Sequence, residues 1–334
     1  DVDGPATFTA GTVAGTYGSI ALQSNGQWTY TANSAHNEFA AGTNYSDTFT
    51  VAATDGTIST ITVNILGTND AAVISTATAN LTETNAVLTA AGSLSITDAD
   101  SAATFVPATI AGTYGSVAID AAGNWNYTAS SAHPEFVAGT NYSDVFTVTS
   151  ADGTTSTITV NILGTNDAAV ISTATANLTE TNAVLTTSGT LNISDADSAA
   201  TFVAGSIAGV HGSITIDAAG NWNYTANSAH NEFVAGANYS DAFTVTSADG
   251  TTSTVTVNIL GTNDTAVLST ATANLTETNA VLTTSGTLTV TDVDSASAFV
   301  PGTIAGTHGS IVIDAAGNWN YTASSAHPEF VAGA

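Results

Sequence analysis

Three observations predict an all-β chain of tandem seven-stranded β-sandwiches in an extended rod. Trp28, Trp125, Trp222 and Trp319 each stand 97 residues apart, which indicates an array of near-identical repeats. Within each repeat, short runs of alternating polarity are separated by turn residues at the spacing of a β-sandwich. Hydrophobic residues make up 43% of the chain, so a core is available despite a formal charge of -27.

The period divides the chain into two complete sandwich repeats, 70–166 and 167–263, and two partial ones. The repeat at 1–69 begins with "DVD", which matches "DAD" at 98–100, and so lacks its first strands. The repeat at 264–334 lacks its last strands. Because such a break divides a sandwich, we expect the native chain to continue on both sides or a neighbouring molecule to complete the fold.

The elements of the repeat at 70–166 follow in order. "NLTET" (80–84) closes the first strand, "SLSIT" (93–97) forms the second, and a less defined third strand lies around 105–110. "SVAI" (116–119) and "WNYTA" (125–129) flank the turn "AAGN" as a hairpin. "VFTVTS" (145–150) and "STITVNIL" (156–163) flank an Asp-Gly turn. Seven strands in a repeat of this length is an immunoglobulin-like size.

Strand periodicity also predicts the core. One face of the last two strands carries five apolar side chains: Phe146, Val148, Ile158, Val160 and Ile162. Trp125 and Tyr127 share a face of their own strand. An aromatic platform for sugars or bases is one interpretation of Trp125, and a core position in the sandwich is the interpretation we favour.

The charge balance excludes several classes of function. The chain has 27 acidic side chains, six histidines and no Lys or Arg. Nucleic acids and anionic membrane surfaces are therefore unsuitable partners, because both are bound through basic residues. There is no Cys, so packing or a metal must hold the fold. No signal peptide and no apolar run of about 18 residues, the length that predicts a membrane span, is present.

Strand direction predicts where carboxylates gather. The first strand of a repeat ends at the pole where the next linker leaves, and the second strand and the Asp-Gly turn return to the pole where the previous linker enters. Each junction should therefore collect acidic residues from two repeats. For the junction at 166–167 the set is Glu83, Asn166, Asp167, Asp195, Asp197 and Asp249. The flanking junctions hold Asn69, Asp70, Asp98, Asp100 and Asp152, and Glu180, Asn263, Asp264, Asp292 and Asp294.

Converging carboxylates repel one another unless a cation neutralises them. Ligands that are all oxygen, without Cys or paired His, suit a hard ion, and a count of six to eight oxygens suits Ca²⁺ better than Mg²⁺. The alternative is that Asp and Asn stand at strand ends because they favour turns, with their charge simply solvated. We favour calcium because acidic positions recur on both sides of every junction.

At these residues the sequence resembles cadherin-type calcium-binding sandwiches, and more closely the VCBS repeats of bacterial surface adhesins. "LTETNAVLTAAGSLSITDAD" (81–100) is similar to the cadherin pattern of a strand-A Glu followed by DxD, and "SADGTTSTITVNILGTND" (150–167) to its turn, last strand and linker. The resemblance covers every repeat and implies calcium at the junction residues named above. Cadherins carry a second acidic pair where this chain reads "YTASSAHPEF" (127–136), which implies one or two ions per junction instead of three.

Other motifs offer weaker candidates. "AHNEF" or "AHPEF" recurs at His36, His133, His230 and His327. One His and one Glu per repeat could bind a transition metal, but we favour a loop cap packed by Phe136. His211 and His308 replace Tyr114, which indicates a tolerant surface site. No Walker loop, G-x-S-x-G or H-E-x-x-H motif is present, so the sequence does not predict an enzyme.

These patterns predict a structural extender of an extracellular bacterial adhesin or surface fibre, with calcium at the repeat junctions making the rod rigid. Its expected partners are calcium, neighbouring repeats of the same or an identical chain, and glycans or other cells reached through further domains. Two alternatives remain. One is a self-assembling filament subunit completed by strand exchange between neighbours, and the other is an array of carbohydrate-binding modules.

Overall fold

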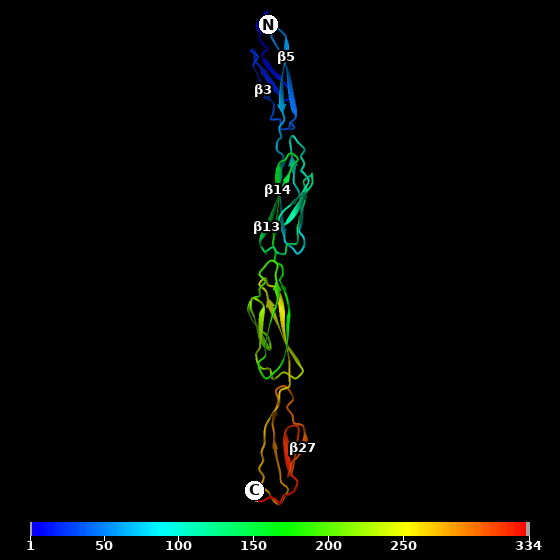
Figure 1. Cartoon of the computed structure of the whole chain (residues 1–334), viewed down its shortest axis with the longest axis vertical. Helices are drawn as coiled ribbons and strands as arrows, with labels where there is room; N and C mark the ends of the chain where they lie inside the picture. The colour runs from blue at the N-terminus through cyan, green and yellow to red at the C-terminus, as the bar shows by residue number, and fades with distance from the viewer. Residues whose placement is uncertain (1, 332–334) are drawn as a thin grey trace. The chain divides into compact units, whose positions relative to one another are not determined.

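The chain folds entirely into β-strands and loops in residues 2–331, the part that the computed structural model describes (Figure 1). It divides into two compact units, Asp1–Asp167 and Ala168–Ala334. Each unit holds one complete repeat and one partial repeat. No helix within the described residues is long and apolar enough to cross a membrane. The all-β prediction is confirmed.

The second repeat (70–166) is a sandwich of two main sheets. Its strands are β6 (Val73–Ile74), β7 (Ala77–Thr82), β8 (Thr89–Ser93), β9 (Ile96–Thr97), β10 (Ala108–Ala111), β11 (Gly115–Ile119), β12 (Asn124–Ala129), β13 (Asn141–Thr149) and β14 (Thr155–Leu163). One sheet has the antiparallel order β10-β11-β12-β8. The other has the order β13-β14-β7, in which β7 runs parallel to β14. Strands β6 and β9 form a short separate pair.

The third repeat (167–263) has the same topology. Its strands are β15 (Val170–Ile171), β16 (Ala174–Thr179), β17 (Thr186–Thr190), β18 (Ile193–Ser194), β19 (Gly205–Ala208), β20 (Gly212–Ile216), β21 (Asn221–Ala226), β22 (Asn238–Thr246) and β23 (Thr252–Leu260). Its sheets are β17-β21-β20-β19, β16-β23-β22 and β15-β18, and β16 pairs with β23 in the parallel direction. Near-identical sequences therefore give the same sandwich twice.

The two partial repeats hold overlapping subsets of these strands. The first repeat (1–69) contains β1 (Gly11–Ala14), β2 (Gly18–Leu22), β3 (Trp28–Ala32), β4 (Asn44–Ala52) and β5 (Ile58–Leu66). The last repeat (264–334) contains β24 (Val267–Leu268), β25 (Thr283–Thr287), β26 (Val290–Thr291), β27 (Gly302–Ala305), β28 (Gly309–Ile313) and β29 (Asn318–Ala323). The "DVD" motif that marks the start of the first repeat begins at residue 1, which lies outside the described residues.

The predicted second strand at 93–97 is wrong. The strand that pairs with β12 is β8, which ends at Ser93, and residues 96–97 form β9 in a different pair. Gly92 allows β8 to lie beside β12, because a Cβ at this position would stand only 2.7 Å from the Trp125 indole. Leu94 then enters the core with 3% of its surface exposed, and the chain changes sheets. The third strand also begins later than predicted, at Ala108, and Phe105 makes only an isolated bridge to Ser150.

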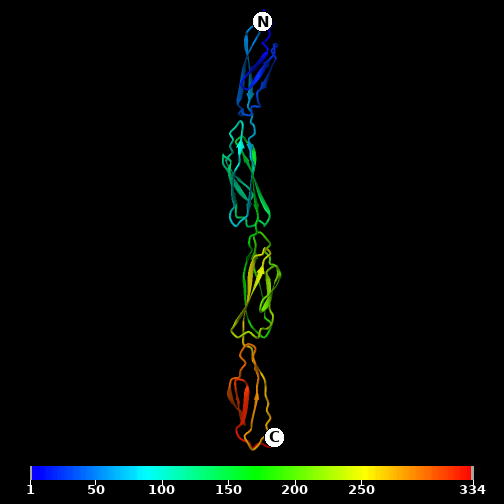
Figure 2. The same ribbon diagram turned by 180° about the vertical axis from the view of Figure 1, so that it is seen from behind.

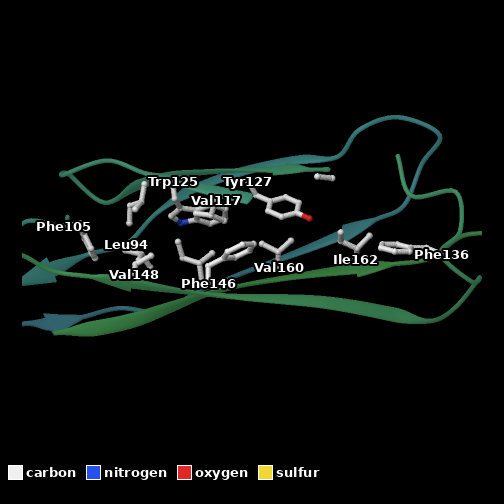
Figure 3. Packing of buried hydrophobic residues seen from close by; sticks show 13 residues of the cluster. Leu94, Phe105, Val117, Trp125, Tyr127, Phe136, Phe146, Val148, Val160 and Ile162 are labelled. Atoms are coloured by element: carbon white, nitrogen blue, oxygen red, sulfur yellow. The ribbon is translucent and has the colours of Figure 1, made fainter. Parts of the chain in front are cut away.

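The core lies between the two main sheets of the second repeat (Figure 3). Phe146, Val148, Ile158, Val160 and Ile162 are each at most 1% exposed, as the strand periodicity predicts. Trp125 is 4% exposed and Tyr127 is fully buried, so the core interpretation of this aromatic pair is confirmed. Complete burial of such side chains supplies most of the favourable free energy of folding.

A buried carboxylate on the inner face of β13 was not predicted from the sequence. Asp144 is 5% exposed and accepts hydrogen bonds from the backbone N–H groups of Thr113 at 2.8 Å and Tyr114 at 2.9 Å. The turn between β10 and β11 is thereby tied to the opposite sheet. Asp241 makes the same bonds in the third repeat, to the N–H groups of Val210 and His211. These carboxylates are structural, because backbone donors already satisfy them.

The first repeat adds a hydroxyl donor to this arrangement. The Tyr30 hydroxyl donates to Asp47 Oδ2 at 3.0 Å, whereas the equivalent Tyr127 hydroxyl is buried without a hydrogen-bond partner. Burial raises the pKa of Tyr127 to about 12, with the charge of Asp144 as the smaller cause. The same position thus carries a satisfied hydroxyl in one repeat and an unsatisfied one in the next.

We expect opposite effects from removing these two hydroxyls. Tyr30→Phe should destabilise the first repeat by about 1–2 kcal/mol, since it deletes a hydrogen bond to a carboxylate. Tyr127→Phe should leave the second repeat unchanged or more stable, since it removes a buried donor without a partner. Hydrogen-exchange mass spectrometry, resolved by repeat, measures both. Equal losses from the two substitutions would contradict the assignment of a hydrogen bond to Tyr30 alone.

Candidate metal centre at the repeat junctions

The structure brings together the predicted ligands at the linker-side pole of the second repeat. Asn69 Nδ2 donates to Asp152 Oδ2 at 3.3 Å, and the Asp70 N–H donates to Asp100 Oδ1 at 3.2 Å. The Asp100 N–H in turn donates to Asp98 Oδ1 at 3.0 Å. The linker, the "DAD" segment after β9 and the Asp-Gly turn after β13 therefore meet at one pole, as strand direction predicts.

Part of this network recurs in the later repeats. In the third repeat the Asp197 N–H donates to Asp195 Oδ1 at 3.1 Å, and the Ala169 N–H donates to Asp249 Oδ2 at 3.0 Å. In the last repeat the Asp294 N–H donates to Asp292 Oδ1 at 3.3 Å. The set predicted at 166–167 is divided between the two compact units: Glu83, Asn166 and Asp167 belong to the first unit, and Asp195, Asp197 and Asp249 belong to the second.

Asp152 and Asp249 are hydrogen-bonded more fully than the other predicted ligands. Asp152 accepts from the hydroxyls of Ser150 and Thr154, from the N–H groups of Thr154 and Ala72, and from the Asn69 amide. These donors, led by Ser150, hold its pKa well below the usual range, and Ser247 and Thr251 do the same for Asp249. Since a carboxylate offers about four lone-pair sites, Asp152 has little capacity left for an ion.

Asp98 and Asp195 shape the "DAD" turn. Asp98 Oδ1 accepts from the Ser101 N–H at 2.8 Å, and its Oδ2 accepts from the Ser101 hydroxyl at 2.6 Å. The Ser101 hydroxyl is the main cause of the lowered pKa of Asp98. Burial acts to raise the pKa of Asp195, but hydrogen bonds from Ser198 outweigh it and the pKa is lowered. Asp98 therefore positions Asp100, and Asp195 positions Asp197.

The opposite pole of each complete repeat holds a buried glutamate. Glu83 is 1% exposed and Glu180 is 2% exposed. Their Oε2 atoms accept from the hydroxyls of Thr165 at 2.5 Å and Thr262 at 2.6 Å, while both Oε1 atoms are buried without a hydrogen-bond partner. A buried carboxylate that is neither paired nor fully hydrogen-bonded is strongly unfavourable, and this chain has no Lys or Arg to pair with it.

The junction at 263–264 lies within the second compact unit. Thr262 bonds Glu180, and Asp264 follows two residues later in the chain, so about 7 Å of extended backbone separates the two positions at most. Asp264 and Asp294 are each 6% exposed. Asp264 Oδ2 and both carboxylate oxygens of Asp294 are buried without a hydrogen-bond partner. Burial and the adjacent Asp292 carboxylate raise the pKa of Asp294, and the nearby Asp264 N–H offsets only part of this.

The donor set fits a hard cation in chemistry. Carboxylate and amide oxygens are the ligands that calcium takes in proteins, and several of them are buried with unused lone pairs. Within residues 2–331, however, no three His, Asp or Glu side chains already surround a single point as metal ligands. Sequence reasoning identified the residues of the pole, but it did not reveal which oxygens are spent on internal hydrogen bonds.

The histidine motif forms a loop cap. His133 Nδ1 lies 2.8 Å from Glu135 Oε1, and its Nε2 lies 2.9 Å from the Tyr114 carbonyl oxygen. The ring stacks on Phe136 with centroids 4.5 Å apart. Both ring nitrogens already have hydrogen-bond partners within this part of the repeat, and the ring packs on Phe136, so the cap interpretation is confirmed. The backbone at His133 has φ of 59°, a left-handed conformation that the three other copies share.

The position of Tyr114 accepts both Tyr and His, as the sequence indicated, but Tyr114 does not lie on the open surface. Its ring is half-buried and packs edge-on against His133, Phe136 and Tyr142. His211 makes the same edge-on contacts in the third repeat. The position accepts Tyr or His because both present an aromatic edge to the cap.

The cap should respond to pH. The Glu38 carboxylate and the Tyr17 carbonyl raise the pKa of His36 above 6.5, and His36 lowers the pKa of Glu38 below 4.5. A raised His pKa gives stability that is complete below 6.5 and is lost as pH rises through the folded value. A lowered Glu pKa gives stability that is complete above 4.5 and is lost as pH falls. The cap is therefore most stabilising between pH 4.5 and pH 6.5, the ordinary pKa values of Glu and His.

We expect His36→Asn to lower the melting temperature of the first repeat most within this pH window and progressively less above it. Asn tolerates the left-handed backbone, so the substitution removes the ion pair and the ring without adding strain. Thermal unfolding of both proteins across pH gives the difference. A loss that stays constant with pH would mean that ring stacking alone stabilises the cap.

Comparisons with known proteins agree with the topology. The model of the bacterial cadherin-like domain matches residues 69–164 and 166–261, and that of a bacterial Ig domain matches residues 1–66. No curated protein matches the sequence.

Solved structures similar to the chain include protocadherin gamma B2 extracellular cadherin domains 1–5, with a TM-score of 0.42 and 11% identity over 96% of this chain and 66% of that one. Mouse cadherin-23 EC22–24 has a TM-score of 0.42 and 13% identity over 78% of this chain and 87% of that one. A Ca²⁺-stabilised adhesin with which an Antarctic bacterium binds ice has a TM-score of 0.25 and 16% identity over 96% and 82%.

Proposed function

Because the chain belongs to the family of bacterial cadherin-like domains, we propose that it is a structural extender of an extracellular bacterial adhesin or surface fibre. Calcium bound at the repeat junctions makes the array rigid. The bacterial Ig-domain match of the first repeat agrees with this role, since both families are typical of surface proteins. No catalytic role is proposed.

The observation that carries the proposal is the burial of unneutralised carboxylates beside the linkers. Glu180, Asp264 and Asp294 are each at most 6% exposed and together leave four oxygen atoms without a hydrogen-bond partner. No Lys or Arg is available anywhere in the sequence. A cation from solution would neutralise this arrangement, and oxygen ligands of this kind favour calcium.

We assign the ligands of the junction at 263–264 to Glu180, Asn263, Asp264 and Asp294, with Asp292 shaping the turn that presents Asp294. Their counterparts elsewhere are Glu83, Asn69, Asp70, Asp100, Asn166, Asp167 and Asp197. Asp98, Asp195, Asp152 and Asp249 serve as positioning residues, since their oxygens are already hydrogen-bonded. When bound, calcium supplies the positive charge that these side chains lack.

The residues of the chain itself set how a bound ion would affect the linker. Glu180 follows β16 and is held by Thr262, so it belongs to the third repeat. Asp292 and Asp294 follow β26 and belong to the last repeat. Asn263 and Asp264 stand between them in the chain. An ion shared by these groups would tie both repeats to one short segment, and without it their negative charges repel one another.

The carbohydrate-binding alternative receives no support from the tryptophans of the two complete repeats. Trp125 and Trp222 are 4% and 3% exposed, because each packs into the core of its repeat. An aromatic platform for sugars needs an exposed face. The complete repeats therefore offer no tryptophan surface for stacking.

Small-angle X-ray scattering with calcium and then with excess chelator tests the proposal. With calcium the maximum dimension should stay long and the ensemble narrow, and chelator should broaden or shorten the ensemble. Glu180→Gln should weaken the response. Glu329→Gln, in the last repeat's cap, which no linker of this sequence follows, should keep it. Identical scattering in the two conditions would mean that the junction carboxylates do not control the linkers.

A further inference from the structure

The loop cap of the third repeat holds a buried amide oxygen that nothing in the repeat satisfies. Asn231 Oδ1 is buried without a hydrogen-bond partner, as is Glu180 Oε1 of the same repeat. Burying a polar atom without a partner costs free energy, so an uncompensated oxygen here calls for an explanation. Figures 1 and 2 show the third repeat in green to yellow and the last in orange to red, joined by one linker.

The backbone of this cap is fixed to the start of that linker. The Gly261 N–H donates to the Ala237 carbonyl at 2.9 Å. The two backbones lie so close that a Cβ on Gly261 would stand 2.4 Å from a carbonyl oxygen of the cap. Thr262, the next residue, donates to Glu180 Oε2 at 2.6 Å. The cap is therefore packed on the segment that leads into the junction at 263–264.

The tip of the cap lies beside the carboxylates of the following repeat. In the first repeat Asn37, the counterpart of Asn231, lines one cleft of about 330 Å³ together with Asp70 and Asp98. Asp70 belongs to the linker, and Asp98 belongs to the "DAD" segment of the next repeat. An Asn at the tip of a cap can therefore reach the junction that follows it.

The same tip carries Pro in alternate repeats. Successive caps read Asn37, Pro134, Asn231 and Pro328. The loop itself is the same in both kinds of cap, because the His before the tip has φ of 61° in the third repeat and 59° in the second. The N–H to C=O bond that closes the turn is 2.9 Å long in the third repeat and 3.0 Å in the second. Pro has no side-chain oxygen, so the exchange removes one polar group without reshaping the loop.

The orientation of the Asn231 amide decides between two roles. Its Nδ2 could satisfy a carboxylate by donating a hydrogen bond, and no ion would then be needed. In the structure the oxygen is buried instead, and Glu180 Oε1 and Asp264 Oδ2 are buried without donors as well. Oxygens that all lack donors would be stabilised by a positive charge, and amide oxygens are common calcium ligands.

We propose that Asn231 is a further calcium ligand of the junction at 263–264, and that Asn37 has the same role at the junction at 69–70. The inference rests on the proposed function, since it requires calcium at these junctions. The junction after the second repeat follows Pro134 and receives no such ligand. The array therefore has two classes of junction. The class with fewer oxygen ligands binds calcium more weakly and should release it first as free calcium falls.

Hydrogen exchange of the linker segments in the 334-residue chain, measured against free calcium, tests the proposal. Residues 261–268 should become protected at lower free calcium than residues 164–171. Asn231→Pro copies the cap of the second repeat, so it should fold, and it should raise the calcium midpoint of 261–268 by about tenfold, a typical loss for a weakened metal site. Pro328→Asn, in a cap that no linker of this sequence follows, is the control and should leave this midpoint unchanged.

Asn231→Asp distinguishes a ligand from a hydrogen-bond donor, because it keeps the oxygens and removes the N–H groups. If Asn231 is a ligand, the added charge should lower the calcium midpoint, and with chelator the same protein should lose protection because one more carboxylate is left unneutralised. A midpoint that rises in Asn231→Asp as it does in Asn231→Pro would mean that Asn231 acts as a donor, which overturns the proposal.

The failure of this inference and the failure of the proposed function give different results. If calcium protects the linkers of the wild-type chain but Asn231→Pro has the wild-type midpoint, Asn231 is not a ligand and the proposed function stands. If calcium leaves the exchange of all linkers in the wild-type chain unchanged, both are overturned.

Discussion

Glu180→Gln is expected to stabilise the calcium-free chain and to remove most of the stabilisation that calcium provides at the adjacent junction. Without an ion, Glu180 is 2% exposed, carries an oxygen without a partner and has no Lys or Arg to neutralise it. Gln has nearly the same shape and no charge. The substitution should therefore raise the free energy of unfolding of the calcium-free chain by about 1–3 kcal/mol, the usual cost of an unsatisfied buried polar group. A structural Glu would show the opposite sign.

With calcium this gain should be offset or reversed. An ion that binds only the folded state stabilises it by about 4 kcal/mol at a thousandfold excess over the dissociation constant. Loss of one carboxylate ligand that weakens affinity a hundredfold would remove about 2.7 kcal/mol of this. Unfolding followed by hydrogen exchange over residues 168–331, with calcium and with chelator, gives both values.

Glu277 is the matched control for this experiment. It occupies the equivalent position in the last repeat, and its Oε1 is likewise buried without a partner, but no Asn-Asp linker follows it in this sequence. Glu277→Gln should therefore leave the calcium response of the 263–264 junction intact. If Glu180→Gln shifts stability equally with calcium and with chelator, Glu180 is not a ligand.

The sequence predicted the sandwich well because its signals are periodic. The regular spacing of Trp28, Trp125, Trp222 and Trp319 sets the repeats, and alternation over two residues identifies the inner faces of β13 and β14. Parity of strand direction placed the carboxylates at the correct poles. The alternating pattern failed to separate β8 from β9, because the chain changes sheets at Leu94 and a two-residue strand is too short to show a period.

Sequence spacing could not predict which acidic residues are hydrogen-bonded within the repeat and which keep an oxygen for an ion. Asp152 and Asp100 look alike in sequence, yet Asp152 is hydrogen-bonded by five donors whereas Asp100 keeps a buried oxygen without a partner. A local signal existed, since Ser150 and Thr154 flank Asp152 symmetrically. Asp144 also had one, because it interrupts the inward apolar face of its strand. Both signals concern hydrogen bonds, which strand periodicity does not report.

Phe146→Ala should destabilise the second repeat by about 3–5 kcal/mol, the usual cost of truncating a buried Phe. Phe146 is 1% exposed and its ring lies 6.0 Å from that of Tyr127, in the middle of the core (Figure 3). The cavity would lie between two sheets whose hydrogen-bonded ladders resist collapse. Val145→Ala is the control, because Val145 is 62% exposed on the outer face of the same strand and should change stability by less than about 0.5 kcal/mol.

The third repeat serves as an internal reference for this loss. Its core contains Phe243 at the place of Phe146, with the same burial and the same neighbouring tyrosine. Hydrogen exchange after Phe146→Ala should therefore rise across 70–166 while protection of 168–263 stays near its original value. In arrays of this kind each repeat carries its own stability plus a term from its neighbours. A parallel loss of protection in the third repeat would mean that the neighbour term dominates, and that the sandwiches unfold as one cooperative body.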